Sequence, residues 1–222
     1  MTVKKIITED QSMSLFHGEL NETYHSTHGA ITESMLIFIQ NGLLPLLSGK
    51  KNLNIIEMGF GTGLNALLTL SSAPESSIYY KTIEAYPLSM DVIHQLNYAY
   101  LPGFDNYRDA FNSMHSSNWE EDIRVNDFFT LHKNKSDLRD FKVEKERYDL
   151  IYFDAFSPNV QPELWTKEVF SKMFESMKPG GVLVTYSSKG IVKQALRDTG
   201  FIVERLPGPP GKRHIVRAVR KF

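Results

Sequence analysis

An apolar stretch that runs into three closely spaced glycines constrains the fold of this chain more than any other feature. Residues 53–60 (LNIIEMGF) are apolar enough for a buried strand, and Gly59, Gly61 and Gly63 lead into residues 64–70 (LNALLTL), which have helical character. Glycine lets a backbone bend tightly and approach a ligand closely, because it carries no Cβ. A strand, a glycine turn and a helix predict the start of a βαβ unit.

The rest of the chain alternates between apolar strands and helical stretches. We expect helices to end where glycines interrupt the pattern, at Asn41-Gly42 and at Gly200, and Ser188 to cap the last helix. The expected strands are 77–86, 123–129, 148–156 and 181–187, and the expected helices are 31–40, 89–98, 169–177 and 191–196. The stretches 201–206 and 213–222, separated by a Pro- and Gly-rich turn, are typical of an antiparallel pair.

This order of elements predicts an α/β fold. Strands that alternate with helices form a Rossmann-like, doubly wound and mostly parallel sheet, which the final hairpin extends with antiparallel strands. At 222 residues with 41% apolar content, the chain can bury one sizeable core. Ligands of such sheets lie outside the carboxyl ends of the strands, near the point where strand order reverses.

Composition excludes several classes of protein. The sequence contains no cysteine, which rules out disulfide scaffolds, thiolate zinc sites and cysteine nucleophiles. No run of eighteen apolar residues occurs, and the two lysines near the start precede no apolar stretch, so we expect neither a membrane span nor a secretory signal. The expected location is the cytoplasm.

Charge is unevenly distributed along the chain. The formal net charge is only -1, yet no acidic residue follows Glu204. The basic residues after it are Arg205, Lys212, Arg213, His214, Arg217, Arg220 and Lys221. This tail is either a local basic patch or an ordinary solvated strand.

The glycine turn alone leaves two adenosine cofactors open. Counted from Gly61, the sequence GTGLNA also fits the G-x-G-x-x-A pattern of nicotinamide dinucleotide sites. Glu84, at the end of the second strand, could accept hydrogen bonds from the ribose hydroxyls of either cofactor.

Two further carboxylates favour S-adenosyl-L-methionine. Glu57, inside the first strand, would suit the ammonium group of that cofactor and would oppose a pyrophosphate. Asp127, near the end of the expected third strand, could accept from the adenine amino group. Glu57, Asp127, Glu84 and the three glycines are therefore the expected cofactor-binding residues.

Several motifs together resemble a known family. The stretches EMGFGTGLN, IEAYPLS, YFDAFSPNVQPELWT, KPGGVLVTYSSKGIVKQAL and GKRHIVRAV occur in the order found in the methyltransferase part of the tRNA 5-methylaminomethyl-2-thiouridine biosynthesis bifunctional (MnmC) proteins and their stand-alone relatives. The similarity begins near residues 24–34 and reaches the C-terminus. The run D-A-F-S-P-x-x-x-P-E-L-W carries most of the specificity, since the glycine turn and KPGG occur in many class I methyltransferases.

The resemblance implies a class I methyltransferase fold and a specific reaction. A methyl group would pass from S-adenosyl-L-methionine to the primary amine of a 5-aminomethyl-(2-thio)uridine at the tRNA wobble position, with neither DNA nor membrane as a partner. The bifunctional proteins also carry a flavin-dependent oxidase domain, for which 222 residues leave no room. We therefore expect methylation alone, on a substrate supplied by a separate oxidase or directly by the pathway's first step.

The chemistry of the implied reaction suggests roles for residues at the acceptor site. Asp154 is the expected catalytic carboxylate, which would orient the amine and take its proton, although a helix-capping role is an alternative. Phe156 and Trp165 would form the apolar sides of the pocket for the base, and Pro158 would stiffen the loop between them. As an alternative, Trp165 only anchors the next helix to the sheet. Lys212 and Arg213 would contact the tRNA.

The N-terminal segment is expected to cover the active-site region. Residues 1–50 would form this segment with one helix, and residues 51–222 the methyltransferase domain of the same globular unit. Tyr24 and His25 would lie near the substrate or cofactor. His25 and His28 have no acidic partner motif, so no metal site is expected.

Three other functions remain open at this point. One is a class I methyltransferase that acts on a small-molecule amine or another nucleoside. Another is a nicotinamide-dependent oxidoreductase, for which the G-x-G-x-x-A pattern is the only support. The third is a non-catalytic RNA-binding module, for which the basic tail is the only support.

Overall fold

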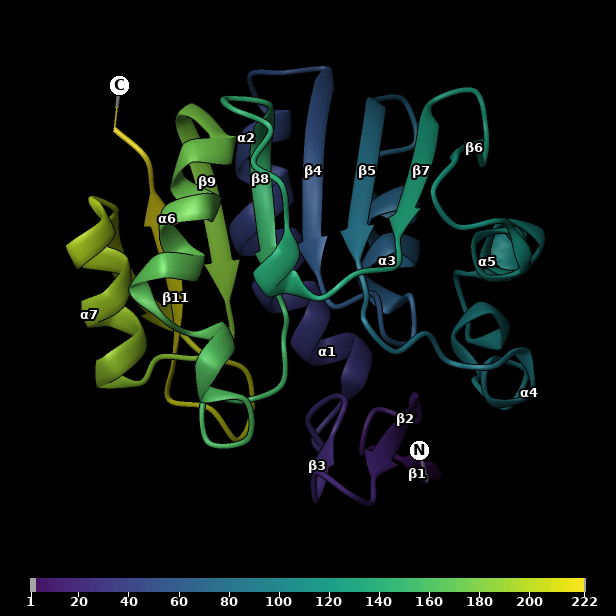
Figure 1. Ribbon diagram of the computed structural model, residues 1–222. Helices are drawn as coiled ribbons and strands as arrows, with labels where there is room; N and C mark the ends of the chain where they lie inside the picture. Colours follow the sequence, from purple (N-terminus) through teal and green to yellow (C-terminus); the bar gives the residue numbers. More distant parts are fainter. Residues whose placement is uncertain (1–2, 222) are drawn as a thin grey trace.

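The computed structural model describes residues 3–221, which form a central sheet with helices on both faces (Figure 1). Two sheets are present among these residues. The strands are β1 (Val3–Ile7), β2 (Met13–His17), β3 (Glu22–Thr23), β4 (Asn52–Met58), β5 (Ser77–Ile83), β6 (Asp122–Arg124), β7 (Phe129–Asn134), β8 (Tyr148–Phe153), β9 (Met177–Thr185), β10 (Ile202–Pro207) and β11 (His214–Val219).

Helices connect these strands. The helices are α1 (Ala30–Ser34), the π-helical η1 (Met35–Leu43), α2 (Leu44–Leu47), α3 (Leu64–Ser72), α4 (Met90–Ile93), α5 (Arg108–Ser116), α6 (Lys167–Ser176) and α7 (Gly190–Thr199). Short 3-10 turns are η2 (Tyr98–Tyr100), η3 (Asp105–Tyr107), η4 (Leu138–Asp140) and η5 (Pro162–Leu164).

The large sheet has the order β10-β11-β9-β8-β4-β5-β7-β6. Strands β9, β8, β4, β5 and β7 are parallel, whereas β11 pairs antiparallel with both β9 and β10. The chain passes outward from β4 to β5 and β7, then returns to the other side of β4 as β8. The expected parallel sheet with a closing hairpin is confirmed, and its strand order reverses between β4 and β8.

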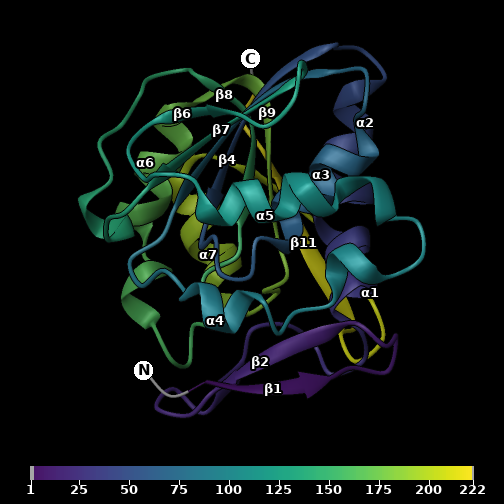
Figure 2. The ribbon, with the colours of Figure 1, turned by 90° about the vertical axis from the view of Figure 1, so that its right-hand side faces the viewer.

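Two apolar layers hold the helices on this sheet. Helices α6 and α7 pack on one face through residues such as Phe170 and Leu196, and η1 and α3 pack on the other through residues such as Phe38 and Leu67 (Figure 2). The continuous helix Ala30–Leu47 is long and apolar enough to cross a membrane by length and composition alone. Its buried residues contact the sheet, as those of a core helix do.

The small sheet β1-β2-β3 lies beneath the carboxyl ends of the large sheet's strands (Figure 1). Its first two strands form an antiparallel hairpin, and β3 adds two residues at the other edge of β2. The chain then turns directly into α1. The N-terminal residues are therefore held over the end of the sheet at which ligands of such folds bind.

Several expected boundaries were wrong. The helix expected at 89–98 is only the short α4, and the strands expected at 77–86 and 148–156 end three residues early. The first helix continues through Asn41-Gly42 to Leu47, and a Cβ at Gly42 would lie 3.0 Å from Val184 Cγ2, so this glycine permits close packing on β9 rather than ending the helix. Lys189, not Ser188, occupies the N-cap of α7. The third parallel strand is β7, because residues 125–128 form a turn that joins it to the short β6.

Asp149 fixes the end of the sheet opposite the small sheet. Its buried carboxylate accepts hydrogen bonds from Lys50 Nζ (2.7 Å), Lys178 Nζ (2.7 Å) and the Asn54 backbone N–H (2.9 Å). These partners lie on or next to β4 and β9, the two neighbours of β8. One carboxylate thus ties three adjacent strands together.

We predict that Asp149→Ala lowers the free energy of unfolding by about 3 kcal/mol, because it removes a buried ion-pair acceptor and leaves the Asn54 N–H unpaired. Urea denaturation measures this change. Asp140→Ala, at an exposed position, is the control and is expected to change stability by less than about 0.5 kcal/mol. Equal stability of the two variants would contradict the prediction.

Candidate active site

The glycine turn after β4 presses against the end of β8. Gly59 has a φ of 92°, and a Cβ there would lie 2.9 Å from the carbonyl oxygen of Asp154. The Asp154 N–H donates to the Met58 carbonyl at 3.1 Å, and the Gly59 N–H donates to the Ile83 carbonyl at 2.9 Å. The turn and the carboxyl end of β8 therefore meet at the point where strand order reverses.

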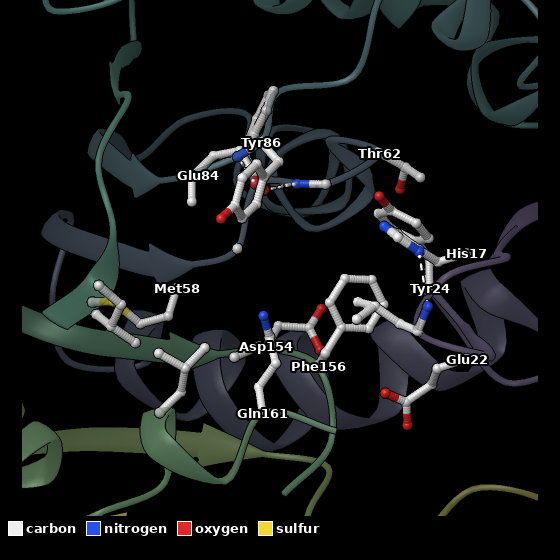
Figure 3. A pocket seen from close by; sticks show the side chains of 18 of the residues that line it. His17, Glu22, Tyr24, Met58, Thr62, Glu84, Tyr86, Asp154, Phe156 and Gln161 are labelled. Atoms are coloured by element: carbon white, nitrogen blue, oxygen red, sulfur yellow. Dashed lines mark hydrogen bonds between the residues drawn. The ribbon is translucent and has the colours of Figure 1, made fainter. Parts of the chain in front are cut away.

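A cavity of about 630 Å³ opens at this point (Figure 3). The glycine turn, the ends of β5 and β8, the segment after β7 and the N-terminal segment all contribute to its lining. Glu84 and Tyr86 lie on one side of it, and Asp154 and Phe156 lie on the other (Figure 3). This volume is typical of small-molecule and cofactor sites.

Glu84 braces the glycine turn. Its Oε2 accepts the Gly61 N–H at 3.0 Å, and its Oε1 accepts the Tyr86 N–H at 2.8 Å. Each carboxylate oxygen has a second lone pair, so both can accept a further hydrogen bond from a ligand. The side chain lines the cavity, in the position expected for a contact with ribose hydroxyls.

Asp154 is half-buried and is held by an amide from the helix that follows the glycine turn. Asn65 Nδ2 donates to Asp154 Oδ2 at 2.9 Å and also to Glu57 Oε1 at 3.0 Å. Burial, and to a smaller extent the Glu33 charge, raise the pKa of Asp154 to about 7, although the Asn65 hydrogen bond and the Lys212 charge oppose the rise. The carboxyl group is thus placed to change its protonation near neutral pH.

Glu57 lies beneath the cavity rather than on its surface. The side chain is fully buried and does not line the cavity. Residues of the glycine turn lie between it and the cavity. Burial raises the pKa of Glu57 well above its ordinary value, against the Asn65 hydrogen bond, and the Asp154 charge adds to the rise. Because Glu57 is buried and does not line the cavity, a direct contact with a ligand there is not expected, and its influence on the cofactor's ammonium group stays a prediction.

The N-terminal segment closes over Phe156. The Phe156 ring packs edge-on against Tyr24, with centroids 5.1 Å apart, and against His17, at 5.7 Å. Glu22 Oε2 accepts the Ser157 N–H at 3.0 Å. Aromatic and polar contacts therefore join the small sheet to the loop after β8.

His25 is neutral in this environment. Its Nδ1 lies 3.0 Å from the Ser14 hydroxyl, and burial lowers its pKa to about 4. Burial and the Glu84 charge raise the pKa of Tyr24. Both side chains line the cavity as neutral groups, so they can contribute hydrogen bonds and apolar surface rather than charge.

Carboxylates dominate the charge of the cavity. The acidic residues that line it are Glu19, Glu22, Glu33, Glu84, Asp137, Asp154 and Glu163, against the cations Arg139 and Lys212. Lys212 is itself ion-paired with Glu33. A cationic ligand would be attracted to this cavity and a phosphate would be repelled.

Two sequence-based assignments need correction. Asp127 lies before β7 rather than after it, its side chain is 83% exposed, and it pairs with Arg124 at 2.8 Å, far from the carboxyl ends of the strands. Asp137, on the segment that follows β7, lines the cavity instead. Trp165 is 3% exposed, and its Nε1 donates to the Phe156 carbonyl at 2.8 Å, so it anchors the loop from below instead of walling a base.

The remaining predicted residues fall into two places. Gly59 and Gly61 line the main cavity, whereas Gly63 is the N-cap of α3, with a φ of 71°. Pro158 and Arg213 line a smaller neighbouring cavity, and Lys212 lines both. Within residues 3–221, no group of three potential ligands could hold a metal ion.

Besides Asp137, the site includes Asn65, Glu33 and Glu22, which were not predicted from the sequence. Asn65 follows the glycine turn by two positions, so its place on the first turn of α3 could have been noticed. Glu33 and Glu22 lie in the N-terminal segment, and only the packing of that segment brings them to the cavity.

Comparison with known proteins identifies the class. Residues 104–221, more than half of the chain, match the family described as S-adenosyl-L-methionine-dependent methyltransferase. The chain belongs to this family of class I methyltransferases, and its cofactor is S-adenosyl-L-methionine. The nicotinamide alternative and the non-catalytic alternative are therefore wrong.

The chain is similar to one particular group of these enzymes. It is 29% identical over 211 residues to the tRNA 5-methylaminomethyl-2-thiouridine biosynthesis bifunctional protein MnmC of Cupriavidus necator, covering 86% of this chain and 31% of that protein. It is 28% identical over 224 residues to MnmC of Chromohalobacter salexigens, covering 94% and 31%. The chain thus spans about a third of the length of these relatives.

Two solved structures are also similar to this chain. The crystal structure of MNMC2 from Aquifex aeolicus superimposes with a TM-score of 0.80 at 26% identity and covers 98% of this chain and 70% of that one. Spermidine synthase from Thermotoga maritima matches with a TM-score of 0.55 at 13% identity, covering 100% and 72%, and shows the shared fold alone.

We predict that Trp165→Phe lowers the free energy of unfolding by about 1–2 kcal/mol, because the Phe156 carbonyl loses its donor while the ring packing largely remains. Chemical denaturation measures this loss, and calorimetry should find the affinity for S-adenosyl-L-methionine within about twofold of wild type. Unchanged stability combined with weaker substrate binding would instead indicate that Trp165 contacts the base.

Proposed function

We propose that this chain methylates the primary amine of 5-aminomethyl-(2-thio)uridine at the wobble position of tRNA, with S-adenosyl-L-methionine as donor. The observation that carries the proposal is the position of Asp154. This carboxylate lies at the reversal point of the sheet, against the cofactor's glycine turn, in a cavity rich in acidic groups. The similarity to the MnmC proteins, whose name states the modified nucleoside, supports the substrate.

The residues around the turn fit S-adenosyl-L-methionine. Gly61 has a φ of 48°, and a Cβ there would make a tight contact of 3.3 Å with the Tyr24 ring, so a glycine suits this position of the turn. Glu84 would hold the ribose hydroxyls, and Asp137 would take the role first expected of Asp127. The acidic lining suits the ammonium and sulfonium charges of the cofactor, which supplies the activated methyl group.

Asp154 would control the state of the acceptor amine. Methyl transfer requires a neutral nitrogen aligned with the donor, and water must be excluded from the site. An ionised Asp154 would first attract the alkylammonium and then accept its proton, which leaves a neutral amine for the attack on the methyl group. Asn65 would fix the carboxylate for this task, since its amide binds one Asp154 oxygen and leaves the other available to the substrate.

The N-terminal segment would complete the site. Residues 1–50 cover the methyltransferase domain of residues 51–222 in this proposal, with Tyr24 and His25 beside the acceptor and Phe156 stacked on the base. A stacked base contributes about 1–3 kcal/mol. The aminomethyl substrate would come from a separate oxidase or from the first step of the pathway, and a tRNA substrate would place the enzyme in the cytoplasm.

Purified protein is expected to add one methyl group to tRNA that carries 5-aminomethyluridine, as detected by nucleoside mass spectrometry. Asp154→Asn should lower the rate by about 10²-fold or more, because it removes the proton acceptor. The same variant should retain binding of S-adenosyl-L-methionine.

Asp198→Asn removes an exposed carboxylate on α7 and serves as the control with wild-type activity. The absence of any methylated nucleoside with the wild-type protein would refute the proposal. Equal rates on free small amines, independent of tRNA, would support the alternative class of substrate.

Binding of S-adenosyl-L-methionine near pH 7 is expected to release protons. Asp154, with a pKa raised to about 7, is partly protonated in the free enzyme, and the positive cofactor lowers that pKa and favours the ionised form. Calorimetry in two buffers of different ionisation enthalpy measures the release.

Two controls isolate the source of these protons. Asp154→Asn should abolish most of the release, and S-adenosylhomocysteine, which lacks the sulfonium charge, should cause less of it. Proton uptake on binding, or the same release from Asp154→Asn, would contradict the assignment.

A further inference from the structure

A second cavity opens beside the candidate active site. It has a volume of about 210 Å³ and shares two lining residues, Tyr186 and Lys212, with the main cavity. Ser157 and Pro158, from the loop that begins at Asp154, also line it. A ligand that fills the acceptor side of the main cavity would therefore pass next to this second cavity.

The charge of the second cavity is opposite to that of the first. Lys189, Lys212 and Arg213 line it together with His214, and none of its lining residues within the described part of the chain is acidic. Lys189 Nζ contacts the neutral Asn159 amide oxygen. Arg213 is exposed, and within residues 3–221 it forms no ion pair with a carboxylate. Two cationic groups here thus retain uncompensated charge.

The start of α7 adds backbone donors to the same cavity. This ten-residue helix begins at Gly190, and no side chain caps its first turn. Ser187, Ser188 and Lys189, the residues that lead into it, line the cavity. The first N–H groups of a helix and the positive end of its dipole favour an anion.

The cofactor does not account for these groups, because S-adenosyl-L-methionine carries no phosphate. An RNA acceptor accounts for them, because a nucleotide within RNA has a phosphate on either side of its ribose. We infer that the second cavity binds a backbone phosphate of the RNA beside the nucleotide whose base enters the main cavity. This inference rests on the proposed function and adds the site that would hold the polymer, while the acidic main cavity, which also holds the cofactor, admits only the base and its amine from the RNA.

The test compares two double variants of equal charge. Lys189→Ala/Arg213→Ala removes the two free cations of the second cavity. Lys193→Ala/Arg205→Ala removes two cations from α7 and β10 that do not line it. Fluorescence anisotropy follows the binding of a labelled, unmodified anticodon-arm RNA hairpin across a series of KCl concentrations.

The first double variant is expected to bind about tenfold more weakly at low salt and to flatten the slope of log K against log[KCl] by about 0.7, the value for one phosphate contact on a single strand. The control should change both quantities much less. Equal effects of the two double variants, or none from the first, would overturn the inference.

A kinetic measurement separates this inference from the proposed function. With Lys189→Ala/Arg213→Ala, kcat/KM for tRNA should fall about tenfold, while methylation of free 5-aminomethyluridine nucleoside, which has no phosphate, should be unchanged. An equal loss on the nucleoside would refute the phosphate site. If wild-type protein methylates neither substrate, the proposed function fails, and the binding series alone decides whether the phosphate site exists.

Discussion

The close contact between Gly59 and Asp154 is the constraint on which the site depends. With 2.9 Å between the position of a Gly59 Cβ and the Asp154 carbonyl, any side chain at residue 59 would force the glycine turn away from the end of β8. The glycine turn and the Asp154 carboxylate would then separate. The same contact brings Asn65, on the helix that leaves the turn, within 2.9 Å of the carboxylate that it orients.

The two adjacent cavities carry opposite charge. The main cavity gathers carboxylates, which favour a sulfonium cofactor and an alkylammonium acceptor, whereas the neighbouring cavity presents Lys189 and Arg213 beside the start of α7. Lys212 stands between the two and is neutralised by Glu33 on the main-cavity side. In our account, this division directs the base of an RNA inward and keeps its backbone outside.

Much of this arrangement follows from the order of residues along the chain. The strand and glycine pattern predicted the parallel sheet, and the rule for carboxyl ends of strands correctly predicted that Glu84 and Asp154 share one cavity. Asp127 was misplaced because the parallel strand begins at Phe129, after it, so the residue lies at the opposite end of the sheet. The small N-terminal sheet was not predicted, since its strands are only two to five residues long and are stabilised by tertiary contacts such as that between Glu22 and Ser157.

The central claim is that this chain methylates aminomethylated wobble uridine in tRNA. The most direct measurement is the modified-nucleoside profile of total tRNA from cells with and without this protein. Cells that lack it are expected to accumulate the 5-aminomethyl nucleoside and to lose the 5-methylaminomethyl form, and expression of the wild-type protein should reverse both changes. An identical profile in the two kinds of cells would contradict the account.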